Sequence, residues 1–281
     1  MKRRAIVWFR QDLRLHDNEA ISTALRMAEE VIPIYVFDER VFMAKTRFGF
    51  PKTGKFRAQF ILECTADLRQ NLRNLGSELL VRTGKPECIL AELARDLKAS
   101  WVLCNRERTH EEVSVQDALE QKLWSTGIEL LYVRGKMLYH TQDLPVPVHH
   151  TPDIFTQFRK DNEHITPVRA PLPTPVAMPA LPAELDPGEM PTLQEFGHAP
   201  VESEERAVLP FKGGETEGLR RAGILDGDVD LAGGVDQPIS ERPPGRGRVV
   251  GQAFQPGDGV GDDRRNLLHE LRELGEEDPA E

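Results

Sequence analysis

The chain has 281 residues, of which 39% are hydrophobic, and it carries a formal net charge of −10. That hydrophobic share is enough for a packed core, and the length allows one large domain or two ordinary ones. An acidic chain gains nothing from bulk attraction to the phosphates of DNA, so nucleic-acid binding would need a local basic stripe. The composition lowers the expectation of DNA binding without excluding a local site.

Targeting signals and cysteines indicate the compartment. The apolar run Ala5–Phe9 is too short for the core of a signal peptide and far too short to span a membrane. The three cysteines, Cys64, Cys88 and Cys104, are odd in number and lie in apolar segments, which favours buried free thiols in a reducing compartment. We therefore expect a cytoplasmic protein with no membrane partner.

Strand and helix patterns alternate along the first 140 residues. Continuous apolar or β-branched runs predict strands over Ala5–Phe9, Val31–Phe37, Glu78–Arg82, Ser100–Cys104 and Ile128–Val133. Apolar residues at helical spacing predict helices over Asn18–Glu30, Thr53–Leu75, Pro86–Lys98 and Glu111–Ser125. In the second helix, Phe56, Phe60, Leu68 and Leu72 are expected to face the core. This alternation predicts a Rossmann-like α/β fold, a five-stranded, doubly wound parallel sheet.

The rest of the chain changes character. We divide it into the α/β domain (1–140), a Pro-rich linker (141–217) and a tail (218–281). Proline at the linker's density excludes helix interiors and central strands, although a short helix is plausible at Asp153–Asn162, with Phe155 and Phe158 docked on the domain. The Gly- and Asp-rich tail lacks apolar area to offset its ordering entropy, so we expect disorder over Gly218–Asp263 and one short helix over Arg264–Gly275.

Three sequence motifs suggest chemistry but fail on inspection. Gly49–Phe56 nearly matches a phosphate-binding loop, but Phe56 replaces the hydroxyl residue that would hold Mg²⁺. The segment His110–Ser114 begins like a zinc helix, but its second histidine is a serine. The histidines at 140, 149 and 150 are more simply interpreted as a solvated surface cluster. We predict no metal site, and no triad or Cys/His pair identifies a catalytic residue.

Ligands of parallel sheets bind at the carboxyl ends of the strands. Four loops qualify by position, namely Arg10–Asp17, Asp38–Pro51, Asn105–His110 and Arg134–His140. In the first loop, Asp12 and Arg14 could serve a ligand, or could equally pair with each other or cap the following helix. In the third, a carboxylate after Asn105 could accept hydrogen bonds from the N–H groups of a heterocycle, and a solvated charged loop explains the same pattern.

Several segments resemble one known family. Val7–Asn18 (V-W-F-R-Q-D-L-R-L-H-D-N) resembles the opening of the cryptochrome/photolyase family, and Lys52–Ala58 with Asp67–Arg69 resembles the family's second helix. A further set resembles the DASH cryptochromes, namely Gly135–His140, Asp143–Pro145, Phe155–Lys160, Met190–Leu193 and Phe211–Thr216. The resemblance covers about residues 1–219, and several independent motifs in the right order make it specific.

The resemblance implies an antenna domain that binds methenyltetrahydrofolate or another chromophore, followed by a helical domain that binds FAD. It implies blue-light-driven repair of pyrimidine dimers in DNA (a deoxyribodipyrimidine photo-lyase activity) or photoreception. The antenna site carries over onto Asn105 and Glu107, with Glu111 or Glu112 as weaker candidates. Arg10 and Asp12 match the family's opening, where we interpret them as architectural.

The tail departs from the family pattern. The three tryptophans, Trp8, Trp101 and Trp124, all lie in the first domain, and no aromatic-rich helices follow Leu219. A flavin needs a pocket that buries most of its surface, so we expect the FAD site to be absent from this chain. We interpret residues from about Glu217 or Arg220 as an out-of-frame translation. Three functions stay open: a DASH-type photolyase, a non-catalytic chromophore-binding module, and a non-functional truncated product.

Overall fold

The computed structural model describes residues 2–201 and 212–223. Its centre is one parallel sheet with the strand order β3-β2-β1-β4-β5. The strands are β1 (Arg4–Phe9), β2 (Glu30–Asp38), β3 (Leu80–Gly84), β4 (Trp101–Asn105) and β5 (Glu129–Val133). The predicted five-stranded, doubly wound α/β fold is confirmed, because all four strand pairings are parallel.

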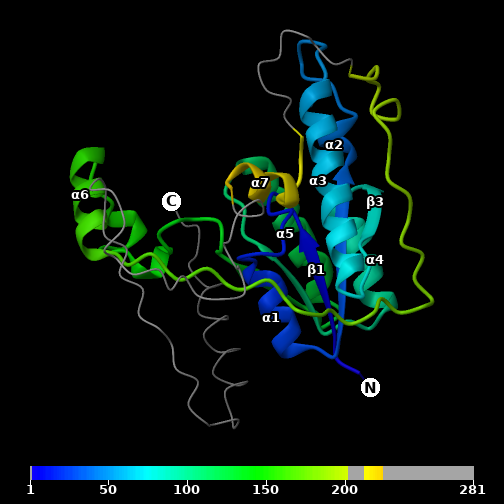
Figure 1. The fold of residues 1–281 in the computed structure, drawn as a ribbon, viewed down its shortest axis with the longest axis horizontal. Helices are drawn as coiled ribbons and strands as arrows, with labels where there is room; N and C mark the ends of the chain where they lie inside the picture. Colours follow the sequence, from blue (N-terminus) through cyan, green and yellow to red (C-terminus); the bar gives the residue numbers. More distant parts are fainter. Residues whose placement is uncertain (1, 202–211, 224–281) are drawn as a thin grey trace.

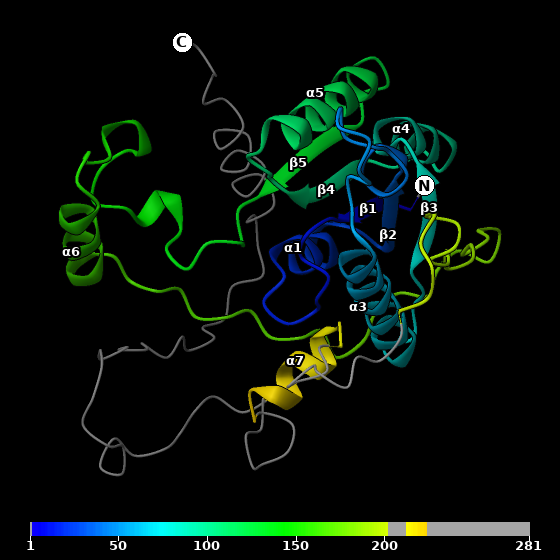
Figure 2. The same ribbon diagram turned by 90° about the horizontal axis from the view of Figure 1, so that it is seen from above.

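Helices cover both faces of the sheet (Figure 2). The elements α1 (Glu19–Met27) and α3 (Lys55–Asn74) pack on one face, and α4 (Pro86–Asp96) and α5 (His110–Trp124) on the other. A single turn, α2 (Glu39–Phe42), follows β2 directly. Because both faces are covered, the central strands are apolar on both sides, and their sequences are the continuous runs from which they were predicted.

Two predicted core residues of α3 lie on its surface. Leu68 and Leu72 are fully buried, but Phe56 and Phe60 are 58% and 45% exposed. The start of α3 is covered, because Ala58 and Ile61 in the same turns are buried, but at 100° per residue Phe56 and Phe60 lie well outside the buried stripe of the helix. The predicted burial was therefore correct for Leu68 and Leu72 and wrong for Phe56 and Phe60, which the helix turns toward solvent.

The cysteines are free, as predicted, but only Cys104 is fully buried, whereas Cys64 and Cys88 are half-buried. Burial raises the pKa of the Cys104 thiol to about 12, so it remains protonated and inert near neutral pH. Cys104 therefore acts as a small apolar side chain of the sheet core.

The Pro-rich linker, taken together with the six residues before it, divides into two unlike parts. Residues 135–168 contain two short 3₁₀ turns, Thr141–Asp143 and Val148–His150, and helix α6 (Phe155–Ile165), which stands away from the sheet (Figures 1 and 2). The predicted helix is present, but the docking of Phe155 is wrong, because its side chain is 72% exposed. We call residues 135–168 the projecting segment.

The second part of the linker, residues 169–201, lies along the domain, and we call it the docked segment. The backbone N–H of Val81 in β3 donates to Pro187 O at 2.8 Å, and Arg82 donates to Asp186 O at 2.7 Å. Met178 and Phe196 are 6% and 5% exposed and belong to the core on the α1/α3 face. The docked segment thus covers the exposed edge of β3.

Residues 212–216 close onto α3 and lead into α7 (Glu215–Arg221), and we call these five residues the clasp. The Gly213 N–H donates to Glu63 at 2.7 Å, and the Glu215 carboxylate accepts from the N–H groups of Leu15 and His16, both at 2.8 Å. Because α7 extends to Arg221, the prediction of disorder from Gly218 is wrong for its first four residues. The remainder of the predicted tail, including the helix expected at Arg264–Gly275, lies outside the described residues.

Candidate functional site

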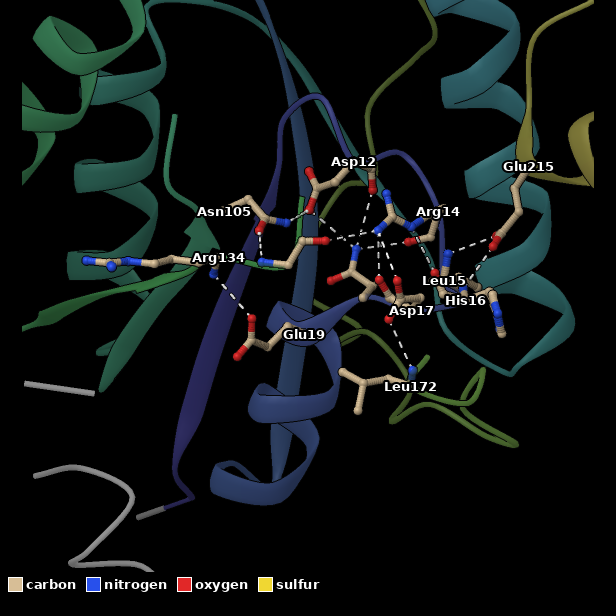
Figure 3. Close-up of polar contacts among 12 residues, drawn as sticks. Asp12, Arg14, Leu15, His16, Asp17, Glu19, Asn105, Arg134, Leu172 and Glu215 are labelled. Carbon is tan, nitrogen blue, oxygen red and sulfur yellow. Dashed lines mark hydrogen bonds and ion pairs between the residues drawn. The ribbon is translucent and has the colours of Figure 1, made fainter. Parts of the chain in front are cut away.

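The loop after β1 is fixed by the carboxylate of Asp12, which is 2% exposed. This carboxylate accepts hydrogen bonds from the Arg10 N–H at 2.9 Å and from the side-chain amides of Asn18 and Asn105. In turn, Asn105 Oδ1 accepts from the Gly135 N–H at 3.1 Å (Figure 3). The strand order reverses between β1 and β4, where a ligand is generally expected. Here the protein's own polar groups fill that crevice.

Arg14 serves the same network. Its guanidinium donates to the carbonyls of His16 at 3.0 Å, Asp17 at 2.9 Å and Gly135 at 3.3 Å (Figure 3). The Arg14 N–H donates to Asp12 O at 2.6 Å, but within residues 2–201 and 212–223 the two side chains are not paired with each other, and Asn18 is the residue that caps α1. The contacts agree with an architectural role for the loop, in which side chains replace the missing backbone partners of a turn.

Glu107 follows β4 and has a fixed backbone. Its N–H donates to Gln116 Oε1 at 2.7 Å, and its carbonyl accepts from Gln116 Nε2 at 3.3 Å. Its carboxylate pairs with Lys136, whose Nζ lies 2.6 Å from each oxygen. Burial raises the pKa of the Glu107 carboxyl above its usual range, and the Lys136 ammonium opposes that rise. A preformed acceptor thus lies at the carboxyl end of β4.

A pocket of about 590 Å³ opens at the carboxyl ends of β1 and β2. Its floor includes Trp8 and Tyr35, and its walls come from the beginnings of α3 and α5. Burial raises the pKa of the Tyr35 hydroxyl well above its usual value, so this group is a neutral donor at all physiological pH values. Aromatic and polar groups therefore face one cavity.

The pocket is rich in cations. Arg10 lies 4.4 Å from the centre of the Trp8 ring and donates to Gln116. Lys52 pairs with Glu111 at 2.6 Å. Arg57 lines the pocket and makes no hydrogen bond or ion pair within residues 2–201 and 212–223. A ligand with an acceptor or an anionic group would find a free guanidinium there.

The predicted antenna residues fall into two places. Glu111 lies on the wall of the pocket, whereas Asn105 and Glu107 are absent from its lining and are held in the neighbouring networks. Arg10 links the two places, because it lines the pocket and bonds the same Gln116 that holds Glu107.

Sequence reasoning missed Tyr35 and Arg57. The strand run around Tyr35 predicts a core residue, and nothing in the spacing shows that its hydroxyl reaches the strand's open end. Arg57 lies one turn into a long helix, where a solvated arginine is the ordinary expectation.

Within the part of the chain that the structure describes, no cluster of three or more histidine, cysteine or acidic side chains could hold a metal ion. Over the same ranges, no helix combines the length and the apolar character that crossing a bilayer requires.

Comparison with known proteins identifies the fold. The DNA photolyase family model matches residues 5–179. Cryptochrome DASH of Gloeobacter violaceus is 45% identical over 216 residues, which is 77% of this chain and 43% of that protein. Blue-light photoreceptor PHR2 of Arabidopsis thaliana is 39% identical, over 79% of this chain and 50% of that protein. The chain spans half or less of the length of these two curated relatives.

Solved structures agree. The cryptochrome of Synechocystis sp. PCC6803 superposes with a TM-score of 0.73 at 37% identity, covering 77% of this chain and 44% of that one. An archaeal photolyase from Sulfolobus tokodaii, described with two FAD molecules and the implication of a novel light-harvesting cofactor, gives 0.61 at 25% identity, covering 82% and 47%. The parallel sheet, the order of the motifs and these matches lead to one conclusion: the chain belongs to the cryptochrome/photolyase family and carries the N-terminal α/β domain of the cryptochrome DASH type.

Proposed function

We propose that this chain is a chromophore-binding module that holds a planar heterocycle, methenyltetrahydrofolate or a flavin, at the carboxyl edge of its sheet. The observation that carries the proposal is the pocket of about 590 Å³ above β1 and β2. Small-molecule sites have volumes of roughly 300–1,000 Å³ and combine aromatic walls with a few polar groups. The pocket meets both conditions.

The groups around the pocket suit such a ligand. Trp8 and Phe42 offer aromatic surface, Tyr35 and Arg57 offer donors, and Glu107 offers an acceptor for ring N–H groups beside the pocket. When bound, the chromophore would supply absorption of near-ultraviolet or blue light. The protein's own residues would bind it, orient it and keep water from its faces.

The name of the Sulfolobus tokodaii structure supports a second chromophore on this domain type, since it reports two FAD molecules and a light-harvesting cofactor for that protein. We extend this to the present chain as part of the proposal. Light-driven repair of DNA, or photoreception, would require the flavin site of the family as well. We expected no flavin site in the tail (218–281), and residues 224–281 of that tail lie outside the described part of the chain.

The compartment is also part of the proposal. The sequence favours the cytoplasm, and curated plant relatives are named chloroplastic/mitochondrial. We retain the cytoplasm for this chain because of its three unpaired cysteines.

The test uses the purified full chain. It is incubated separately with methenyltetrahydrofolate, FMN and FAD, passed through gel filtration, and examined by absorbance. We expect one chromophore to co-elute with the protein, and Arg57→Gln to weaken its binding about tenfold through loss of a charge-assisted hydrogen bond. Lys160→Gln, on the exposed side of α6, is the matched control and should bind normally. A protein that carries none of the three would favour the alternative, a product without cofactor function.

A further inference from the structure

The loop between α2 and α3, together with the first turn of α3, concentrates positive charge on an acidic chain. The chain carries a formal net charge of −10, yet residues 41–62 contain no acidic side chain and hold five cations, namely Lys45, Arg47, Lys52, Lys55 and Arg57. Lys52 pairs with Glu111, whereas Lys45, Arg47 and Lys55 are exposed and form no ion pair within residues 2–201 and 212–223. We call residues 43–57 the basic segment.

The basic segment also holds exposed aromatic side chains. Phe48, Phe50 and Phe56 are 70%, 69% and 58% exposed. The guanidinium carbon of Arg47 lies 4.7 Å from the centre of the Phe48 ring, and Lys55 Nζ lies 4.8 Å from the centre of the Phe56 ring. A ring left in water forgoes the free energy of burial, so several exposed rings close together in the chain indicate an interaction surface.

Backbone hydrogen bonds hold the tip of the basic segment in a hairpin. The Thr46 N–H donates to Phe50 O at 2.7 Å, and the Gly49 N–H donates to Thr46 O at 2.9 Å. Gly49 has φ +85°, the left-handed region that favours glycine. At the base of the loop, the buried Thr53 hydroxyl donates to Val41 O at 2.8 Å. The hairpin is therefore preorganised, and less conformational entropy is lost when its tip binds a partner.

We propose that the basic segment docks the protein on an anionic lipid bilayer, with Phe48 and Phe50 inserted among the headgroups and the cations bound to lipid phosphates. The order of the residues fits a layered partner. The hairpin tip carries no charged side chain, and Lys45, Arg47 and Lys52 flank it. Apolar rings gain from burial at the boundary between headgroups and acyl chains, and neighbouring cations gain from the negative surface.

Single-stranded nucleic acid is the other partner that cations and aromatic rings could fit. Its bases stack on open ring faces that accompany a positively charged groove. Here a cation of the basic segment already occupies one face of the Phe48 ring and one face of the Phe56 ring. The two most exposed rings of the segment also belong to one hairpin tip and not to a groove. This arrangement favours the bilayer.

A contact of this kind is peripheral. It needs no membrane-crossing helix, and no helix over residues 2–201 and 212–223 is long and apolar enough to be one. The inference departs from the expectation of no membrane partner, which considered only segments that cross a bilayer. It goes beyond the proposed function and does not depend on it, because Phe48, Phe50 and Arg47 do not line the pocket.

Vesicle binding tests the inference on the purified full chain. The protein is mixed with vesicles of phosphatidylcholine alone, or of phosphatidylcholine and phosphatidylglycerol in equal amounts, and the bound fraction is measured by cosedimentation. Two double variants separate the contributions. Phe48→Ser with Phe50→Ser removes the apolar tip, and Lys45→Gln with Arg47→Gln removes two cations.

The matched controls change exposed positions of α6. Phe155→Ser removes a ring that is 72% exposed, and Lys160→Gln removes one exposed cation. Because all the altered side chains are exposed, circular dichroism should show every variant folded like the wild type. In a further variant, Phe48→Trp, the added emission should shift to the blue with the mixed vesicles, and the three tryptophans of the wild type supply the baseline.

We expect the wild type to bind the mixed vesicles and not phosphatidylcholine alone, and added salt should weaken the binding because it screens surface charges. Each double variant should bind about tenfold more weakly or worse, and both controls should bind as the wild type does.

Three outcomes would overturn the inference. The first is no binding to the mixed vesicles, or equal binding by the wild type and the variant without Phe48 and Phe50. The second is binding of a single-stranded oligonucleotide without binding of vesicles, lost in the same double variants, which assigns the basic segment to nucleic acid. The third is a dimer in gel filtration that those variants dissociate, which assigns it to a second copy of the chain.

Discussion

The two halves of the linker differ in how they contact the domain. The projecting segment leaves Ile154, Phe155 and Ile165 at 65% exposure or more, whereas the docked segment buries Met178 and Phe196 to 6% or less. The docked segment holds eight prolines and the projecting segment four, and the surfaces within their reach also differ.

The docked segment reaches surfaces that need covering. It passes β3, an edge strand with free backbone groups, and the aromatic cluster at the end of β2. The projecting segment leaves from the end of β5 and reaches no such surface in the described part of the chain (Figure 2). In this protein the linker therefore packs on the domain where it can contact both an edge strand and a gap in the core.

Replacing one phenylalanine in each half gives the sharpest test and the largest expected effect. Phe196→Ala should cost about 3–5 kcal/mol of unfolding free energy, because Phe196 packs 5.4 Å from Phe37 and 5.0 Å from Phe42, measured between ring centres. Phe155→Ala, on exposed α6, should change stability by less than about 0.5 kcal/mol. Urea unfolding of the full chain measures both. Equal effects would contradict the division into docked and projecting segments.

The clasp gives the next largest effect. Gly214 has φ +119°, and an added Cβ would lie 2.7 Å from Asp67 Cβ, so Gly214→Ala should cost about 1–3 kcal/mol. We expect faster hydrogen exchange at the Leu15 and His16 amides, since Glu215 would lose its position. Gly218→Ala, inside α7 and with open space around it, is the control. Unchanged protection of those amides in Gly214→Ala would show that the clasp does not depend on this close approach.

The smallest effect concerns the junction between the two halves. Arg169 donates to the Asp143 carboxylate at 2.6 and 2.9 Å, and this holds the pKa of Asp143 below its usual range. Because the folded pKa is depressed, the pair stabilises the fold above about pH 3.9, the unfolded pKa, and loses that contribution as pH falls through the folded value. Both side chains are partly exposed, so it contributes only about 0.2–1 kcal/mol. An NMR titration in which Arg169→Gln leaves the pKa of Asp143 unchanged would refute the pairing.

The fold could be predicted well from the sequence because each strand is marked by its own short stretch of residues. Each strand is a short apolar run, and each was placed within two residues at either end. The third strand was misplaced most. Glu78 pairs with Arg69 and Arg73 before the strand begins at Leu80, and the predicted closing residues Thr83 and Gly84 are part of it.

The site was only partly predictable. Glu111 lines the pocket from the first turn of α5, and its role as a ligand contact stays a prediction; the pocket's donors Tyr35 and Arg57 come from elements with no local signal. Neither does spacing reveal that Gln116 would hold the backbone of Glu107, nine residues earlier. Such contacts depend on how strands and helices cross in space, which one sequence does not specify residue by residue.

The prolines of the docked segment have a consequence for self-association. At Pro187 the chain presents a carbonyl to the Val81 N–H of β3, but the proline ring has no N–H to offer outward. A second molecule that approached β3 at Val81 would meet the docked segment, which offers no N–H at Pro187 for a further strand to pair with. The docked segment therefore covers the edge of β3 at this point and hinders the pairing of β3 with a second molecule.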